Sequence, residues 1–141
     1  MKFAEISGQK IAVIALDTLV IGSGCAGFNA ADTLWDLGRK EIALLTEGIK
    51  MGTSRNTGSD KQTYYKLSLC SDSADSIYEL ADNLFQGGSV NGDTALAEAA
   101  GSLRSFMKLV NLGVPFPTNV YGEYVGYKTD HDPYRRATSC G

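Results

Sequence analysis

The spacing of apolar and polar positions predicts a strand, a turn, a helix and a second strand near the start of the chain. A short apolar run ends at Ile21, and a glycine-rich turn follows at once. Apolar residues at helical spacing over residues 25–37, with Gly38 directly after them, predict a helix. Residues 41–46 form a second apolar run. This strand-helix-strand order is typical of an α/β protein with a parallel sheet.

The turn has the spacing G-x-G-x-x-G between a predicted strand and a predicted helix, which is the context of the dinucleotide-binding fingerprint. Gly22 suits a tight turn, Gly24 lets the backbone approach a pyrophosphate, and Gly27 lets the helix pack closely on the sheet. The unpaired N–H groups and the dipole at a helix start favour a bound phosphate. We therefore expect the whole turn to contact a cofactor: Gly22, Ser23, Gly24, Cys25, Ala26 and Gly27.

An acidic residue, Glu47, follows the second predicted strand, about 20 residues beyond the glycines. A carboxylate at that place accepts hydrogen bonds from a ribose diol, and it would repel a 2′-phosphate. The alternative is a solvated loop carboxylate. Glu47 and its neighbour Gly48 are thus predicted cofactor residues.

The rest of the chain predicts a long polar loop and two helices. Residues 1–16 are a lead-in that contains a candidate edge strand at residues 11–16, and residues 48–73 are polar and rich in turn residues. Two apolar stripes at helical spacing follow, and both are predicted to be core: Ala74, Ile77, Leu80, Ala81 and Leu84, then Leu96, Leu103, Met107 and Val110. The segment Asn91-Gly92-Asp93-Thr94 predicts the start of the second helix, and the tyrosines at 121, 124 and 127 indicate a short hairpin or an aromatic-lined loop.

The sequence predicts only two strands of a parallel sheet. A parallel sheet needs other elements packed on both of its faces, and one helix cannot supply them. We therefore interpret residues 17–141 as the N-terminal portion of a Rossmann-like domain with an incomplete parallel sheet. The remainder of the protein, or another chain, would cover an exposed apolar face formed by residues 19–21 and 42–45.

Composition excludes some classes of function. The formal net charge of −3 gives no basic stripe for nucleic acid. No apolar run is long enough to span a membrane, and three cysteines without metal-ligand spacing indicate a reducing compartment, so we expect a cytoplasmic protein without a metal site.

From Asp17 to Gly141 the chain resembles the N-terminal end of the succinate dehydrogenase and fumarate reductase flavoproteins. The likeness rests on the strand and glycine turn, on Leu44-Leu45-Thr46-Glu47-Gly48, on Gly52-Thr53-Ser54 with Thr57-Gly58, and on Leu112-Gly113-Val114-Pro115-Phe116. It implies that FAD binds the turn, Glu47 and the loop residues Thr53, Ser54, Arg55, Thr57, Gly58 and Ser59. It also implies that Phe116 lies on the substrate side.

The chain departs from the family in the same loop. Ser59-Asp60 stands where fumarate reductases have Gly-Gly, and the loop lacks the histidine that carries covalent FAD in some members. FAD is therefore expected to bind noncovalently. The catalytic arginine of the family lies beyond the segment matched here, so the substrate is not carried over.

Two classes of function remain. The first is an FAD-dependent oxidoreductase that moves a hydride between flavin and a small organic substrate, an unsaturated or carboxylic acid among the candidates, with the isolated chain inactive. The second is a nucleotide-binding or interaction module without redox activity; an NAD enzyme is a weaker third. His131, between two acids, and Arg136 are the candidates for catalysis.

Overall fold

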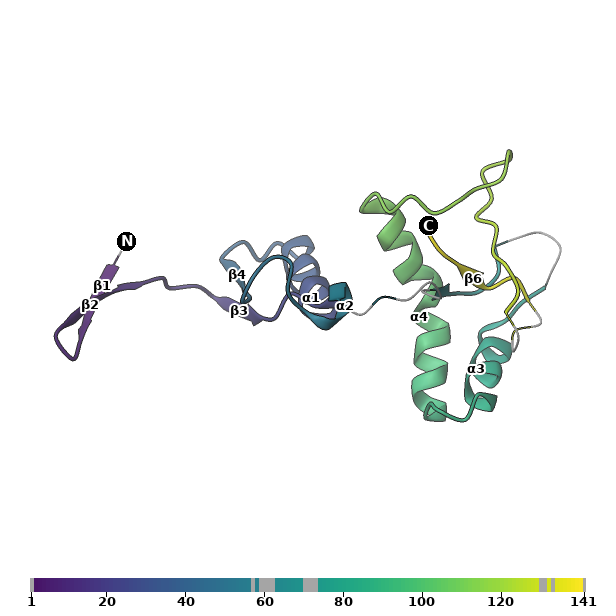
Figure 1. Ribbon diagram of the computed structural model, residues 1–141, viewed down its shortest axis with the longest axis horizontal. Helices are drawn as coiled ribbons and strands as arrows, with labels where there is room; N and C mark the ends of the chain where they lie inside the picture. The colour runs from purple at the N-terminus through teal and green to yellow at the C-terminus, as the bar shows by residue number, and fades with distance from the viewer. Residues whose placement is uncertain are drawn as a thin grey trace. The chain divides into compact units, whose positions relative to one another are not determined.

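The computed structural model describes residues 2–56, 58, 63–69, 74–129, 132 and 134–140. The chain divides into two compact units, Met1–Asp60 and Lys61–Gly141, and each is described by itself (Figure 1). Among the described residues, the chain is mixed α/β with three two-stranded sheets. No described helix is long and apolar enough to cross a membrane.

The first unit contains the predicted strand-helix-strand segment. Strands β3 (Thr18–Ile21) and β4 (Ile42–Leu45) pair in parallel from Thr18↔Ile42 to Ile21↔Leu45, and α1 (Cys25–Asp36) connects them. The helix ends before Gly38, whose φ of +82° is a conformation that glycine adopts without strain. The parallel pair is thus confirmed, while a full Rossmann fold stays a prediction.

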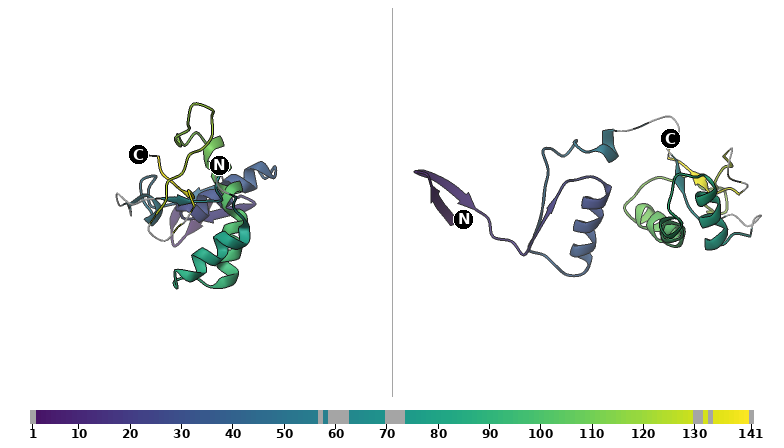
Figure 2. Two further views of the ribbon diagram at one scale, coloured as in Figure 1. Left: turned by 90° about the vertical axis from the view of Figure 1, so that its right-hand side faces the viewer. Right: turned by 90° about the horizontal axis from the view of Figure 1, so that it is seen from below.

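One face of this parallel pair is uncovered. Helix α1 lies against the strands (Figure 2). On the opposite face Leu19, Ile21 and Leu45 are 52%, 77% and 55% exposed. The predicted exposed apolar face is therefore confirmed for this unit.

The N-terminal segment forms a hairpin instead of a single edge strand. Strand β1 (Lys2–Ile6) pairs antiparallel with β2 (Gln9–Val13), so the strand predicted over residues 11–16 is present only to Val13 and begins two residues earlier. Ser7 and Gly8 both have positive φ, 52° and 76°, as a two-residue hairpin turn of type I′ requires. The Ser-Gly pair was the overlooked signal.

The second unit contains an antiparallel pair of helices, α3 (Ile77–Gln86) and α4 (Gly92–Asn111). Each begins at a side-chain cap. Ser76 Oγ accepts the Glu79 N–H at 3.1 Å. Asn91 Oδ1 accepts the Asp93 and Thr94 N–H groups at 2.9 and 3.4 Å, which confirms the predicted start of α4.

The core face of α4 differs from the predicted one by one position. Leu80 and Ala81 of α3 form a buried cluster with Ala95 and Ala99, and Ser102 and Phe106 continue the same face. Leu96 and Met107 are 40% and 38% exposed, so the stripe that contained them was wrong as a core prediction. Small alanines allow two helices to approach closely, and the larger apolar residues beside them then lie at the rim of the contact.

The remaining elements are short. Helix α2 (Thr53–Asn56) belongs to the first unit, and in the second unit β5 (Tyr64–Tyr65) pairs antiparallel with β6 (Ala137–Thr138). Tyr124 packs edge-on against Phe106 at 5.0 Å, and no strand forms over residues 120–126. The tyrosine segment is therefore no hairpin of two strands: Tyr124 packs inward, Tyr121 is exposed, and Tyr127 forms an isolated antiparallel bridge with Ala137.

Candidate functional site

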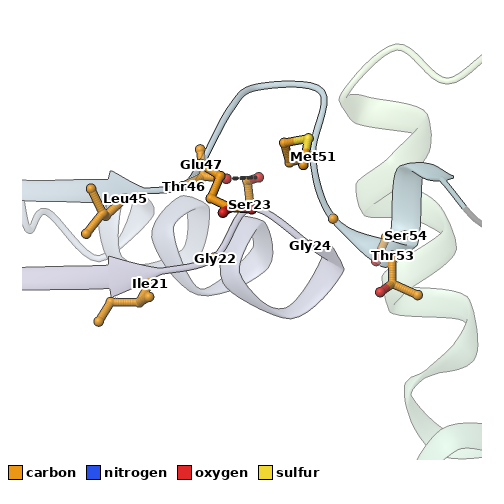
Figure 3. A pocket seen from close by; sticks show the side chains of 11 residues that line it. Ile21, Gly22, Ser23, Gly24, Leu45, Thr46, Glu47, Met51, Thr53 and Ser54 are labelled. Atoms are coloured by element: carbon orange, nitrogen blue, oxygen red, sulfur yellow. Dashed lines mark hydrogen bonds between the residues drawn. The ribbon is translucent and has the colours of Figure 1, made fainter.

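A pocket of about 640 Å³ opens at the edge where β3 and β4 both end. Its side chains come from the two strand ends and from the loop that follows β4 (Figure 3). In parallel α/β sheets, ligands bind in the crevice beyond the carboxyl ends of the strands. The pocket is lined by Ile21, Gly22, Ser23, Gly24, Leu45, Thr46, Glu47, Met51, Gly52, Thr53 and Ser54.

Two glycines of the turn are required by the fold of the chain itself. Gly22 has φ +98°, and its N–H donates to the Leu45 carbonyl at 2.8 Å. A Cβ on Gly27 would lie 1.9 Å from the Gly22 carbonyl oxygen and 3.6 Å from Val20 Cγ1. Any side chain at Gly27 would push α1 away from the turn, as predicted for close helix–strand packing.

Gly24 is different, because no contact with the residues that the structure describes demands a glycine there. Its backbone is extended, with φ −68° and ψ 178°, which any residue can adopt. A Cβ there would meet only Ser54 Oγ, at an ordinary contact distance of 3.5 Å. The missing side chain therefore leaves open backbone beside the pocket.

The start of α1 offers unpaired donors to the same space. Gly24 provides no side-chain cap, and the first turn contains no acidic residue. The Cys25 N–H donates to Ser54 Oγ at 3.0 Å, while the N–H groups of Ala26 and Gly27 have no acceptor within the helix. This helix end therefore favours a bound anion. The Cys25 thiol is exposed.

A chain of hydroxyl groups connects the two strand ends. Thr46 Oγ1 donates to the Gly48 carbonyl at 3.3 Å, and Ser23 Oγ lies 2.9 Å from Thr46 Oγ1 (Figure 3). Because the single hydroxyl proton of Thr46 is used on Gly48, Ser23 is the donor in this pair. The arrangement fixes the strand end that carries Glu47.

Glu47 is the second residue after β4, is exposed, and lines the pocket. Among the described residues of the lining, it is the only one with a carboxylate, ammonium, guanidinium or imidazole group. The structure thus brings Gly22, Ser23 and Gly24 of the predicted turn together with Glu47 at one opening, whereas the other predicted residues Cys25, Ala26, Gly27 and Gly48 are not part of the lining.

The loop after Glu47 supplies the opposite wall. Gly52 has φ +105°, and a Cβ on it would lie 3.7 Å from the backbone nitrogen of Gly24. Thr53 and Ser54 line the pocket as predicted, whereas exposed Arg55 does not. Of the other predicted loop residues, Gly58 is exposed, and Thr57 and Ser59 lie outside the described residues.

Arg136, a candidate for catalysis, is fully buried in the second unit. Its Nε and Nη2 donate to the two carboxylate oxygens of Asp75 at 2.9 and 2.6 Å. Its Nη1 donates to Asp132 Oδ1 at 3.2 Å and to Asn83 Oδ1 at 2.5 Å. We call these four residues the Arg136 cluster; it connects the start of α3 to β6.

Charge and burial act against each other in the Arg136 cluster. Burial lowers the pKa of Arg136, but the hydrogen bonds and charge of Asp75 raise it more, so the net pKa lies above its usual value. Burial likewise raises the pKa of Asp75, and the hydrogen bonds from Arg136 and from the Ser68 and Ser76 N–H groups bring it below its usual value. A guanidinium that is buried and bonded in this way favours a structural role over contact with a substrate.

Phe116 belongs to an aromatic cluster of the second unit. Its ring lies 4.5 Å from that of Phe106 and 6.3 Å from that of Tyr64, and it borders a separate pocket of about 340 Å³. This placement neither requires nor excludes a substrate beside it. His131 lies outside the described residues.

Sequence reasoning missed several residues of these two regions. Thr46 and Met51 line the pocket, and Asp75, Asn83 and Asp132 surround Arg136. A hydroxyl directly before Glu47 was a usable signal for the first. The partners of Arg136 are 53 to 61 residues away or in a polar loop, and nothing local in the sequence pairs them.

Comparisons of the chain with models of protein families, with curated proteins and with solved structures found no match.

Proposed function

We propose that the chain is the FAD-binding part of a flavoprotein oxidoreductase that holds FAD noncovalently and serves hydride transfer with a small organic substrate. Gly24 is the observation that carries the proposal: its backbone is open toward the pocket, and among residues 2–56 and the other described segments no contact explains a glycine there. A ligand that approaches the backbone closely does explain it.

The residues of the pocket fit the ADP portion of FAD. The N–H groups at the start of α1 would hold the pyrophosphate, and the Glu47 carboxylate would accept the ribose hydroxyls. The Thr53 and Ser54 hydroxyls lie on the same opening and would donate to phosphate. No histidine occurs in residues 48–62, which supports noncovalent binding.

FAD, when bound, would supply the redox centre, and this chain would supply position and electrostatics. The pocket described here concerns the nucleotide end. Arg55 and Lys61 are two cationic residues of the loop sequence that would stabilise the negative charge of a reduced flavin. The uncovered face at Leu19, Ile21 and Leu45 supports a further partner, either the remainder of the flavoprotein or another chain.

A nucleotide-binding or interaction module without redox activity is the second candidate. One observation favours it: among the described residues of the pocket lining, Glu47 is the single carboxylate, and no described lysine, arginine or histidine lines the pocket. Such a lining can bind a nucleotide but has no group for proton transfer at neutral pH besides that carboxylate.

Titration of the full chain with FAD, ADP and NAD separates these candidates. For the flavoprotein we expect FAD to bind more tightly than ADP, with a shifted flavin absorption band and release of all flavin on acid precipitation. Equal affinity for FAD and ADP, with an unchanged flavin spectrum, would favour the module. No binding of any of the three would overturn both.

A further inference from the structure

The loop that forms one wall of the pocket is closed by a side chain outside the pocket lining. Asn56, the last residue of α2, donates from Nδ2 to the Lys50 carbonyl at 3.1 Å and to the Gly52 carbonyl at 2.9 Å. Two carbonyl oxygens can face only the NH₂ group of the amide, because both are acceptors. The orientation of the Asn56 amide is therefore determined by its surroundings.

The backbone bonds of α2 converge on the same acceptor. The Arg55 and Asn56 N–H groups both reach the Gly52 carbonyl, at 3.3 and 3.2 Å. Gly52 itself has a φ of +105°, and a Cβ built on it would lie 3.7 Å from the backbone nitrogen of Gly24. Asn56 thus connects the two ends of a seven-residue turn, residues 50–56, with Lys50 and Gly52 on one side and the end of α2 on the other.

This closure determines where Ser54 lies. Ser54 is the middle of α2, and its Oγ accepts the Cys25 N–H at 3.0 Å. In accepting that bond, Ser54 keeps its own hydroxyl proton for another acceptor. A turn that opened at Asn56 would withdraw both Ser54 and Gly52 from the fingerprint glycines.

We propose that Asn56 is a positioning residue for the dinucleotide pocket: by bridging the Lys50 and Gly52 carbonyls, it holds the 50–56 turn so that Ser54 lies at the start of α1, beside the bound pyrophosphate. The inference rests on the proposed function, since it assigns the purpose of the turn to dinucleotide binding. Asn56 would not contact the ligand.

The test compares Asn56→Leu, which keeps the size and the neutral charge but removes the donor, with Asn56→Gln, which keeps an amide donor. Asn111→Leu, at the exposed end of α4, is the matched control. Affinities for FAD and for ADP are measured on each full chain, together with amide hydrogen exchange of the peptide spanning residues 48–56 and the free energy of unfolding.

We expect Asn56→Leu to weaken FAD and ADP binding by about tenfold, because a turn that lacks one or two hydrogen bonds is in its binding-competent form for a smaller fraction of the time. Exchange in residues 48–56 should become faster, the free energy of unfolding should fall by no more than those hydrogen bonds contribute, and Asn56→Gln should recover most of the affinity. Affinity within twofold of wild type for Asn56→Leu, about 0.4 kcal/mol, would overturn the proposal whether or not exchange changed.

Failure of the proposed function gives a different result. If the wild-type chain binds neither FAD nor ADP, the dinucleotide pocket is refuted and with it the purpose assigned to Asn56. Faster exchange in Asn56→Leu alone would then show only that the amide closes the turn.

Discussion

The two regions that attracted functional predictions treat their polar groups in opposite ways. In the first unit, the pocket presents exposed Glu47, two hydroxyl-bearing loop residues and the uncapped start of α1. In the second unit, the Arg136 guanidinium is fully buried and bonded to Asp75, Asp132 and Asn83. Charge alone therefore does not indicate a site; what matters is whether the fold already satisfies the group.

The same contrast separates the glycines of the turn. Gly22 and Gly27 are explained by a positive φ and by a backbone clash within the chain, so they support the fold. Gly24 has neither a positive φ nor a backbone clash, so it is evidence for a bound ligand. A residue that the fold leaves unexplained is the better guide to binding.

The largest expected effect is on the stability of the second unit. Arg136→Met removes the cation from two buried carboxylates and should destabilise this unit by about 3–5 kcal/mol, since an uncompensated buried charge is costly. Chemical denaturation measures it, with exposed Arg104→Met as the matched control. FAD affinity should stay unchanged. A variant that remained stable but had lost FAD binding would indicate that Arg136 belongs to the binding site.

The second largest effect is expected for Gly24→Val. The side chain would fill the backbone opening toward the pocket, so FAD binding should fall by about 3 kcal/mol or more, in the range of steric overpacking. Unfolding should change little, because a Cβ there meets only an ordinary contact. Gly101→Val, on α4 where a Cβ meets nothing within 4 Å, controls for the added branched residue. Full flavin content in Gly24→Val would refute the phosphate cradle.

Glu47→Gln should have a smaller effect on the same site. Loss of the charge from a ribose-binding carboxylate weakens binding by about 1–2 kcal/mol, as for a charge-assisted hydrogen bond. Isothermal titration with FAD provides the measurement. Binding as tight as that of the wild type would indicate that Glu47 is a solvated loop carboxylate and not a ribose ligand.

Acid should produce the smallest of these effects, through Asp75 of the second unit. The pKa of Asp75 lies below its ordinary value of 3.8 in the folded chain, so Asp75 contributes stability that is present above that pH and is lost as pH falls through the folded pKa. Denaturation of wild type and Asp75→Asn between pH 6 and about 3 tests the sign. Equal slopes for the two proteins would show that Asp75 does not contribute to the acid dependence.

The sequence predicted those parts that depend on local pattern. Strand, turn, helix and second strand follow from periodicity and from glycines at fixed spacing, and Asn91 correctly marked the start of α4. The hairpin turn at Ser7-Gly8 was also local but was overlooked.

Other features depend on contacts between distant residues. The core face of α4 is set by how closely α3 approaches its alanines, which periodicity alone does not give. The Arg136 cluster joins residues up to 61 positions apart. In the pocket, Asn56 acts through the carbonyls of its own turn, and backbone acceptors leave no mark in the amino-acid sequence.

Amide chemical-shift mapping of the full chain during titration with FAD and ADP tests the central claim most directly. We predict that both ligands shift the amides of residues 22–27 and 47–54 most strongly, and that the amides of Asp75, Asn83, Asp132 and Arg136 stay in place. Absence of shifts in the glycine turn, or shifts concentrated in residues 63–140, would contradict the dinucleotide pocket.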